Sequence, residues 1–146
     1  MTNTAEDRPP AVPPRLRSAP KIRQIYWCDF PQDAQLPEFW KRRPVIVVSY
    51  RNKLSGAVTV IPCSTLDQSN NPWAVLLSTS MTIGASSWAI CDKPYTVAVR
   101  RLFPDRQGIP RLSMPDFDAV LSKLLQWRPT PPPTPVPSVT KTTSGL

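Results

Sequence analysis

Three consecutive cations, Lys41, Arg42 and Arg43, stand directly before a proline and a run of β-branched apolar residues, in the stretch WKRRPVIVVSY. Two aromatic residues, Phe39 and Trp40, precede them. Aromatic rings beside cations suit single-stranded nucleic acid, because bases stack on the rings and phosphates pair with the charges. The stretch therefore predicts an RNA-binding surface; the alternative is that the two aromatic side chains simply cover one end of the core.

The residue inventory limits the chemistry that this chain can perform. It contains no histidine, which excludes Ser-His-Asp and Cys-His catalysis, and its four glycines are too scattered for a phosphate-binding loop. Three isolated cysteines do not form a zinc site, so neither a metal nor a cofactor is expected. RNA transesterification remains possible, because the substrate supplies its own 2′-OH nucleophile and the protein need only position it and stabilise charge.

Proline content defines the expected domain. Many of the twenty prolines gather at the two ends of the chain, where they favour extended, disordered segments. We therefore predict a disordered basic arm over residues 1–21, one domain over 22–128 and a disordered Pro/Thr-rich tail over 129–146. The net charge of +8 suits a polyanion such as RNA, or an acidic protein partner.

Short apolar runs between polar turns predict an antiparallel β-domain, either a barrel or a sandwich. The expected strands are residues 24–30, 45–50, 57–61, 73–78, 87–91 and 95–99. The run at 45–48 does not alternate with polar residues, which predicts a strand covered on both faces. Pro44 is expected to open this strand and not to lie inside it, which places Arg42 and Arg43 at its rim.

One helix is predicted near the end of the domain. Ser113 is its expected N-cap, Asp116 is placed to complete a reciprocal capping box, and Trp127 and Pro129 end it. An apolar stripe at helical spacing is expected to pack on the sheet or on another subunit, and consists of Phe117, Val120, Leu121, Leu124 and Leu125.

Cys28, Cys63 and Cys91 each lie in or beside an apolar run, which favours buried free thiols over disulfides. The polar N-terminus does not resemble a signal peptide, and no apolar run approaches the length of a transmembrane helix. The expected location is cytoplasmic, with no membrane association.

Four segments, taken together and in this order, resemble the PemK/MazF toxins of type II toxin-antitoxin systems. They are IYWCDF at 25–30, KRRPVIVVS at 41–49, VIPCST at 60–65 and SWAICDKPYTVAVRRL at 87–102. The resemblance covers the whole expected domain. It implies a mainly β fold, a small SH3-like barrel of about six strands with a C-terminal helix. It also implies a homodimer that cleaves single-stranded RNA without metal and that an acidic antitoxin inhibits.

The resemblance also implies roles for particular residues. Arg43 corresponds to the arginine that the family uses at the cleaved phosphate and in proton transfer. Ser64 falls on the hydroxyl residue of a "P-x-T" motif, with Thr65 as a substitute. Asp92 matches an aspartate that serves as a base in some members; alternatively it orients Arg43 through a bidentate ion pair. The predicted RNA-binding residues are Phe39, Trp40, Lys41, Arg42 and Arg51.

Two positions depart from the family pattern. Ile90 occupies a place where some members have an arginine, and Ile22-Arg23-Gln24 occupies the place of a glycine that usually precedes the first strand. The second change is expected to affect only the entry turn.

Two other functions remain open from the sequence. One is a non-catalytic barrel, similar to the gyrase-poisoning CcdB toxins or derived from a decayed toxin, that binds an antitoxin, RNA or gyrase. The other is a proline-rich adaptor that presents its two ends to partner domains. Lys41–Arg43 has a structural alternative as well, since a charged strand edge protects against aggregation.

Overall fold

The computed structural model describes residues 8–78 and 86–133, and within these ranges it contains one mainly antiparallel sheet and one long helix. The strands are β1 (Ile25–Cys28), β2 (Arg43–Val47), β3 (Ala57–Ser64), β4 (Ala74–Leu76), β5 (Trp88–Ile90), β6 (Tyr95–Ala98) and β7 (Leu102–Phe103). A 3-10 turn at Val99–Arg101 (η2) separates β6 from β7, and the helix α1 spans Met114–Trp127. The predicted class, mainly β with a C-terminal helix, is confirmed.

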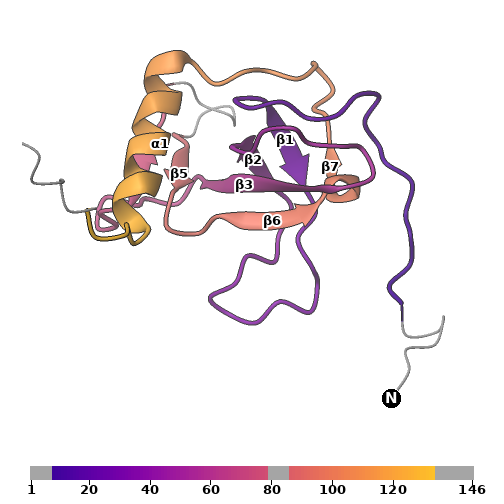
Figure 1. Cartoon of the computed structure of the whole chain (residues 1–146), viewed down its shortest axis with the longest axis horizontal. Coiled ribbons are helices and arrows are strands. Elements are labelled where there is room, and N and C mark those ends of the chain that lie inside the picture. The colour runs from indigo at the N-terminus through magenta and orange to yellow at the C-terminus, as the bar shows by residue number, and fades with distance from the viewer. Residues whose placement is uncertain (1–7, 79–85, 134–146) are drawn as a thin grey trace, which may run out of the picture.

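The sheet is curved around the long strand β3. The hydrogen-bonded order is β4-β5-β3-β2-β1-β7, and β6 pairs with the first half of β3 while β5 pairs with its last two residues. No pairing among the described strands closes this sheet into a complete barrel. Figure 1 shows α1 at one end of the sheet and the N-terminal segment at the other.

The prediction that β2 is covered on both faces is confirmed. Val45 and Val47 point into one buried cluster with Tyr26 and Val60, whereas Ile46 belongs to a second cluster that α1 covers. All three β2 residues are fully buried. A strand with a core on each side needs apolar residues at every position, which explains the absence of alternation in the sequence.

Two prolines lie within strands where the sequence did not place them. Pro44 is the second residue of β2 and not its opener, but pairing with β3 begins only at Val45. Pro62 lies inside β3, between the residues that pair with β6 and those that pair with β5. Each proline therefore falls where one edge of its strand has no partner, so its missing N–H does not interrupt a ladder.

The entry turn before β1 has an unusual backbone. Arg23 adopts a φ of 72°, in the left-handed region that glycine tolerates best. Its Nε donates to the Leu112 carbonyl at 3.0 Å, and its backbone N–H donates to the Val47 carbonyl at 3.0 Å. Arg23 thus lies in the segment that occupies the place of the family's glycine. These two bonds help to hold the strained turn.

The helix begins as predicted, but its capping is shared with the sheet. The Ser113 hydroxyl accepts the Asp116 N–H at 3.3 Å. The Asp116 carboxylate, however, accepts the N–H and the hydroxyl of Ser78, at 2.9 and 2.7 Å, so it links α1 to the segment after β4. Of the predicted stripe, Phe117 and Val120 are buried and Leu125 is exposed, so Leu125 is not a core residue of this chain.

The segment before β1 differs from the predicted disordered arm. Leu16 is buried in the same core cluster as Phe30 and Leu102, and Arg15 makes hydrogen bonds to the domain. The chain therefore packs on the sheet from about residue 15 onward. At the other end, residues 129–133 are exposed without regular structure, and the rest of the predicted tail lies outside the described residues.

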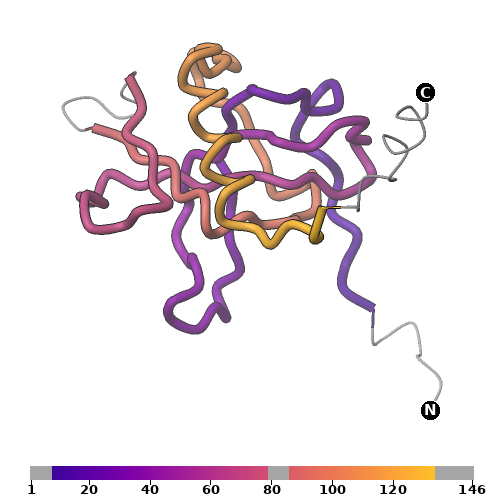
Figure 2. The backbone as a smooth tube through the Cα atoms, turned by 60° about the vertical axis from the view of Figure 1, so that its left-hand side comes forward, coloured from indigo at the N-terminus to yellow at the C-terminus, as the bar shows by residue number. Residues whose placement is uncertain are grey.

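The connection between β1 and β2 is the longest loop between neighbouring strands of the described sheet, and it projects away from the sheet (Figures 1 and 2). Phe39 and Trp40 lie near the end of this loop. Lys41 and Arg42 follow them, and β2 begins at Arg43. The sheet thus presents Arg43 at the point where this loop meets the core.

Candidate functional site

A pocket of about 260 Å³ opens at the start of β2. Residues of β1, β2 and β3 and of the connections that follow β3 and precede β5 form its wall. The lining residues are Trp27, Lys41, Arg42, Arg43, Pro44, Cys63, Ser64, Thr65, Leu66 and Ser87. We call this the arginine pocket. It brings together Lys41–Arg43, Ser64 and Thr65, which the sequence predicted as site residues, and its lining contains cations and hydroxyls but no carboxylate.

Arg43 is held by both its backbone and its ring contact. It pairs with Cys28 of β1, and its guanidinium lies 4.4 Å from the centre of the Phe39 ring. Its Nε is buried and has no hydrogen-bond partner among the described residues. Burial lowers the pKa of Arg43 below its ordinary value, an effect that the Tyr95 hydroxyl partly opposes. A buried donor without an acceptor is costly, and a phosphate oxygen could satisfy this one only if the side chain moved to expose it.

The two predicted hydroxyl residues of the pocket differ in exposure. Ser64 ends β3, is 6% exposed, and accepts the Leu66 N–H at 3.1 Å. This bond fixes the position of its oxygen and leaves its own hydrogen available for donation. Thr65 is exposed at the mouth of the same pocket. Ser64 is thus the better oriented of the two donors.

The two predicted stacking residues have different environments. Phe39 packs against Phe30 and Tyr95, with ring centres 5.9 and 5.8 Å away, and its backbone N–H donates to the Tyr95 hydroxyl. Trp40 is 50% exposed, and the Lys41 ammonium lies 5.0 Å from its ring centre. Phe39 therefore covers the end of the core and supports Arg43, whereas Trp40 has a ring that remains open to a base.

Asp92 lies in a different pocket from Arg43. That pocket, which we call the Asp92 pocket, is lined by Pro37, Glu38, Asp92, Lys93, Pro94, Tyr95 and Trp127. The Asp92 carboxylate accepts a bond from the Asn71 side chain at 3.4 Å. No ion pair joins Asp92 to Arg43 within residues 8–78 and 86–133, so the predicted bidentate pair is not formed.

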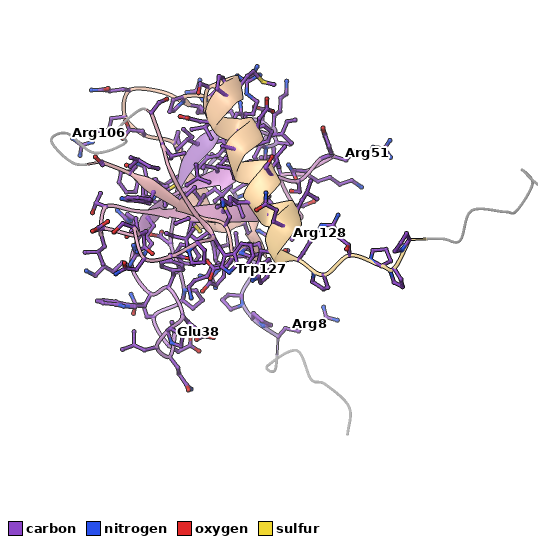
Figure 3. The ribbon with its side chains drawn as sticks, turned by 90° about the vertical axis from the view of Figure 1, so that its left-hand side faces the viewer. Arg8, Glu38, Arg51, Arg106, Trp127 and Arg128 are labelled. Atoms are coloured by element: carbon purple, nitrogen blue, oxygen red, sulfur yellow. The ribbon has the colours of Figure 1, made fainter. Side chains whose placement is uncertain are left out.

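Arg51 also lies apart from the arginine pocket. It occupies a turn beyond the opposite end of β2, has a φ of 55°, and lines a separate cavity with Tyr50 and Asn52. Figure 3 shows Arg51 at one side of the molecule and Glu38, which belongs to the loop that leads to Arg43, at another. The predicted RNA-binding set is therefore not one surface.

The lining also contains residues that were not predicted as site residues, among them Trp27 and Ser87. Residues 25–28 alternate between partly buried and buried, and this places Trp27 on the same face of β1 as Ile25, opposite Tyr26 and Cys28. Its Nε1 donates to Asp105 at 3.2 Å. The period-2 pattern of the first strand could have assigned Trp27 to this face, whereas no local signal pointed to Ser87.

The three cysteines are free and buried, as predicted. Burial raises the pKa of Cys28 and of Cys91 to about 12 and raises that of Cys63 as well, so all three remain thiols at neutral pH. Across the described parts of the chain, no three His, Cys, Asp or Glu side chains are grouped in a way that would hold a metal ion. None of the described helices is long and apolar enough to cross a membrane.

Together, the curved antiparallel sheet, its single covering helix and a cationic pocket at the start of β2 define a small β-domain suited to bind a phosphate. Residues 21–127 match the family model described as the PemK-like, MazF-like toxin of type II toxin-antitoxin systems. The chain belongs to this family, as the motifs at 25–30, 41–49, 60–65 and 87–102 predicted.

Solved structures show the same fold at low sequence identity. MazF from Deinococcus radiodurans is 19% identical with a TM-score of 0.58, over 74% of this chain and 94% of that one. An endoribonuclease in complex with its cognate antitoxin, from a Mycobacterial species, is 19% identical with a TM-score of 0.54, over 77% and 100%. The Mycobacterium tuberculosis toxin MazF-mt6 is 23% identical with a TM-score of 0.52, over 72% and 95%. A comparison with curated protein sequences gave no significant match.

Proposed function

We propose that this protein is the toxin of a type II toxin-antitoxin system and cleaves single-stranded RNA without a metal ion. The observation that carries the proposal is the Arg43 guanidinium, which is held over Phe39 in a pocket with Ser64 and Thr65 and has a buried Nε that lacks an acceptor. The family match and the similarity to a structure described as an endoribonuclease support it.

In this mechanism the 2′-OH of the substrate attacks the adjacent phosphorus. A bond forms between the 2′ oxygen and phosphorus while the bond from phosphorus to the 5′ oxygen breaks, which leaves a 2′,3′-cyclic phosphate and a 5′-OH. Arg43 and the Ser64 hydroxyl stabilise the additional negative charge that develops on the phosphate oxygens.

Proton transfer follows from the composition of the arginine pocket. Since no carboxylate lines the pocket, the 2′-OH proton passes to water. The leaving 5′ oxygen takes a proton from the Arg43 guanidinium, which then regains a proton from solvent. Arginine is a weak acid even so, and we expect slow turnover compared with nucleases that use histidine.

The test is incubation of a long single-stranded RNA with the purified protein in EDTA, beside Arg43→Ala. Cuts by the parent alone, with 2′,3′-cyclic phosphate ends, are expected. Arg128→Ala is the matched control, because Arg128 is an exposed arginine at the end of α1 and only its backbone N–H is bonded within the described chain (Figure 3). No cuts by a folded parent that still binds RNA would favour the non-catalytic binding module.

We further propose an acidic antitoxin as partner, a homodimer as the working form and the cytoplasm as the location. A structural neighbour is described in complex with its cognate antitoxin, and the net charge of +8 favours an acidic partner. Co-expression with a short acidic protein encoded by a neighbouring reading frame, followed by purification and size-exclusion chromatography, would test partner and stoichiometry together. Recovery of the protein alone as a monomer would contradict both.

A further inference from the structure

Residues of the N-terminal segment contribute to the wall of the domain beside the arginine pocket. Leu16 is 7% exposed and packs in the core cluster that contains Phe30 and Leu102. Arg15 lies next to it on the surface. Both residues precede the range 21–127 that matches the family model.

The carboxylate of Asp29 is the common partner of two arginines. Its Oδ2 accepts from a terminal amino group of Arg15 at 2.9 Å, and its Oδ1 accepts from the Nε of Arg42 at 2.9 Å. Both guanidinium groups also lie over the ring of Phe103, at 4.5 and 4.6 Å from its centre. Arg15 and Arg42 are thus held in one cluster, although 26 positions separate them.

Arg15 is fixed by more than its ion pair. The amino group that bonds Asp29 also donates to the carbonyls of Arg100 and Arg101, at 3.3 and 3.1 Å. Arg101 in turn donates from its guanidinium to the Asp29 carbonyl at 3.2 Å. These contacts join the N-terminal segment, the end of β1 and the 3-10 turn, and they leave the Asp29 carboxylate little freedom to rotate.

The bond to Asp29 orients the Arg42 guanidinium and leaves its two terminal amino groups free to bind an anion. Arg42 is attached through Nε, whereas its two terminal amino groups have no partner among the described residues. Its side chain is 60% exposed, and the residue lines the arginine pocket beside Arg43. Two arginines on one carboxylate carry a net charge of +1 (two positive minus one negative), so the cluster still attracts an anion.

We propose that Arg15 is a positioning residue which, through Asp29, holds Arg42 as a preformed fork for an RNA phosphate next to the cleaved one. Without Arg15 the Asp29 charge would be balanced by Arg42 alone, and both side chains would gain freedom. A fixed planar fork loses less entropy when it binds a phosphate than a mobile one does. This inference rests on the proposed function, because it takes RNA as the ligand.

The first experiment compares Arg15→Ala with Arg17→Ala, using a short RNA that the parent cleaves once. Arg17 is exposed on the same segment and makes no hydrogen bond, ion pair or ring contact with the described residues, so it controls for the loss of one positive charge. We expect Arg15→Ala to raise KM by about two- to five-fold, the range for an exposed ion pair, with kcat unchanged. The Kd for the same RNA with a 2′-deoxy nucleotide at the cleavage site should rise equally, and Arg17→Ala should change neither.

The second experiment asks whether Arg15 acts through Arg42. In the Arg42→Ala background, the Arg15→Ala substitution should have no further effect on KM or Kd. Equal effects in both backgrounds would overturn the proposal. If the substitution merely destabilised the fold, it would lower the melting temperature and the fraction of active protein, and would leave the KM of the active fraction unchanged in either background.

The outcomes separate the two proposals. If the parent cleaves RNA and Arg15→Ala behaves like Arg17→Ala, the positioning role is wrong and the proposed function stands. If the parent binds the 2′-deoxy RNA but does not cleave, the nuclease proposal fails while the Kd values still decide the role of Arg15. If the parent neither cleaves nor binds RNA, both proposals fail.

Discussion

The arginine pocket and the Asp92 pocket border the same aromatic cluster but have opposite chemistry. Phe39 lies under Arg43, and its partner Tyr95 lines the Asp92 pocket. The first pocket gathers three cations and three hydroxyl residues without a carboxylate, whereas the second contains Asp92 and Glu38 with a single lysine. Motifs that stand together in the family pattern are thus divided between two surfaces in this chain.

This division shows which catalytic roles can be carried over from the family. Arg43 and Ser64 line the same pocket, so one bound phosphate could contact both side chains. Together they could stabilise the negative charge that develops on its oxygens. Asp92 is outside that pocket and bonded to Asn71, so it is not placed to act as a base on the same substrate atom. Substitutions on the two sides should therefore have very different effects.

Arg43→Lys should cause the largest loss, about a hundredfold in kcat, because the ammonium cannot replace the planar fork that meets the phosphate. Single-turnover cleavage in EDTA measures the effect. Parental activity in this variant would remove Arg43 from the mechanism and end the contrast between the two pockets.

Phe39→Leu should reduce cleavage by up to about tenfold. The ring lies under the Arg43 guanidinium, and a partly buried cation–π contact contributes about 1 kcal/mol or more. Phe39→Tyr keeps the ring and is the control. Circular dichroism at the assay temperature separates loss of activity from loss of fold, and equal activity of the two variants would contradict a role in supporting Arg43.

Ser64→Ala should reduce kcat by about fivefold, the equivalent of roughly 1 kcal/mol for one hydrogen bond. Thr65→Val should have a smaller effect, because Thr65 is exposed and its hydroxyl is not oriented by a bond to the described residues. The reverse order would show that Thr65 supplies the donor and that the loop after β3 shifts when RNA binds.

Acid should lower the stability of the folded protein by protonating Asp29, which pairs with Arg15 and Arg42. Partial burial alone would raise the pKa of Asp29, but the bonds and charges of Arg42 and Arg15 outweigh it and lower the pKa below its ordinary value. The stabilisation is therefore fully present above the unfolded pKa of about 3.9 and is lost as the pH falls through the lower folded value. Asp29→Asn should remove this pH dependence, at a cost of at most about 1 kcal/mol at pH 7. Urea unfolding from pH 7 to pH 2 measures it, and identical pH profiles of the parent and the variant would refute it.

Asp92→Asn should have the smallest effect, within about twofold in kcat, as is usual for a partly exposed residue outside a site. The same single-turnover assay applies. A tenfold loss would place Asp92 in the reaction after all and would require the loop between β1 and β2 to move when RNA binds.

Local pattern was sufficient for the parts of the fold that rest on local rules. The run Val45–Val48 predicted a strand covered on both faces, Ser113 predicted the start of α1, and apolar neighbours predicted buried cysteines. In each case the deciding physics acts within a few residues or depends only on average burial.

The misses share a different origin. Strand β7 is two residues long, which is too short for a recognisable pattern. The second half of β3 was missed because a proline, Pro62, lies inside the strand, and a proline is accepted there only where one strand edge has no partner. Leu125 follows helical spacing but is exposed, so it does not pack on the core that α1 covers. These features depend on distant partners, which single-sequence rules do not see.

The sequence by itself determined the family, the mainly β class and the cations at the start of β2, because these follow from motif order, residue inventory and local burial. Only the tertiary structure decided that Arg43 lines the same pocket as Ser64 and not that of Asp92, and that Arg15 and Arg42 share Asp29. Which charged groups meet across a sheet depends on strand register and loop path, and both are set by the packing of the whole chain.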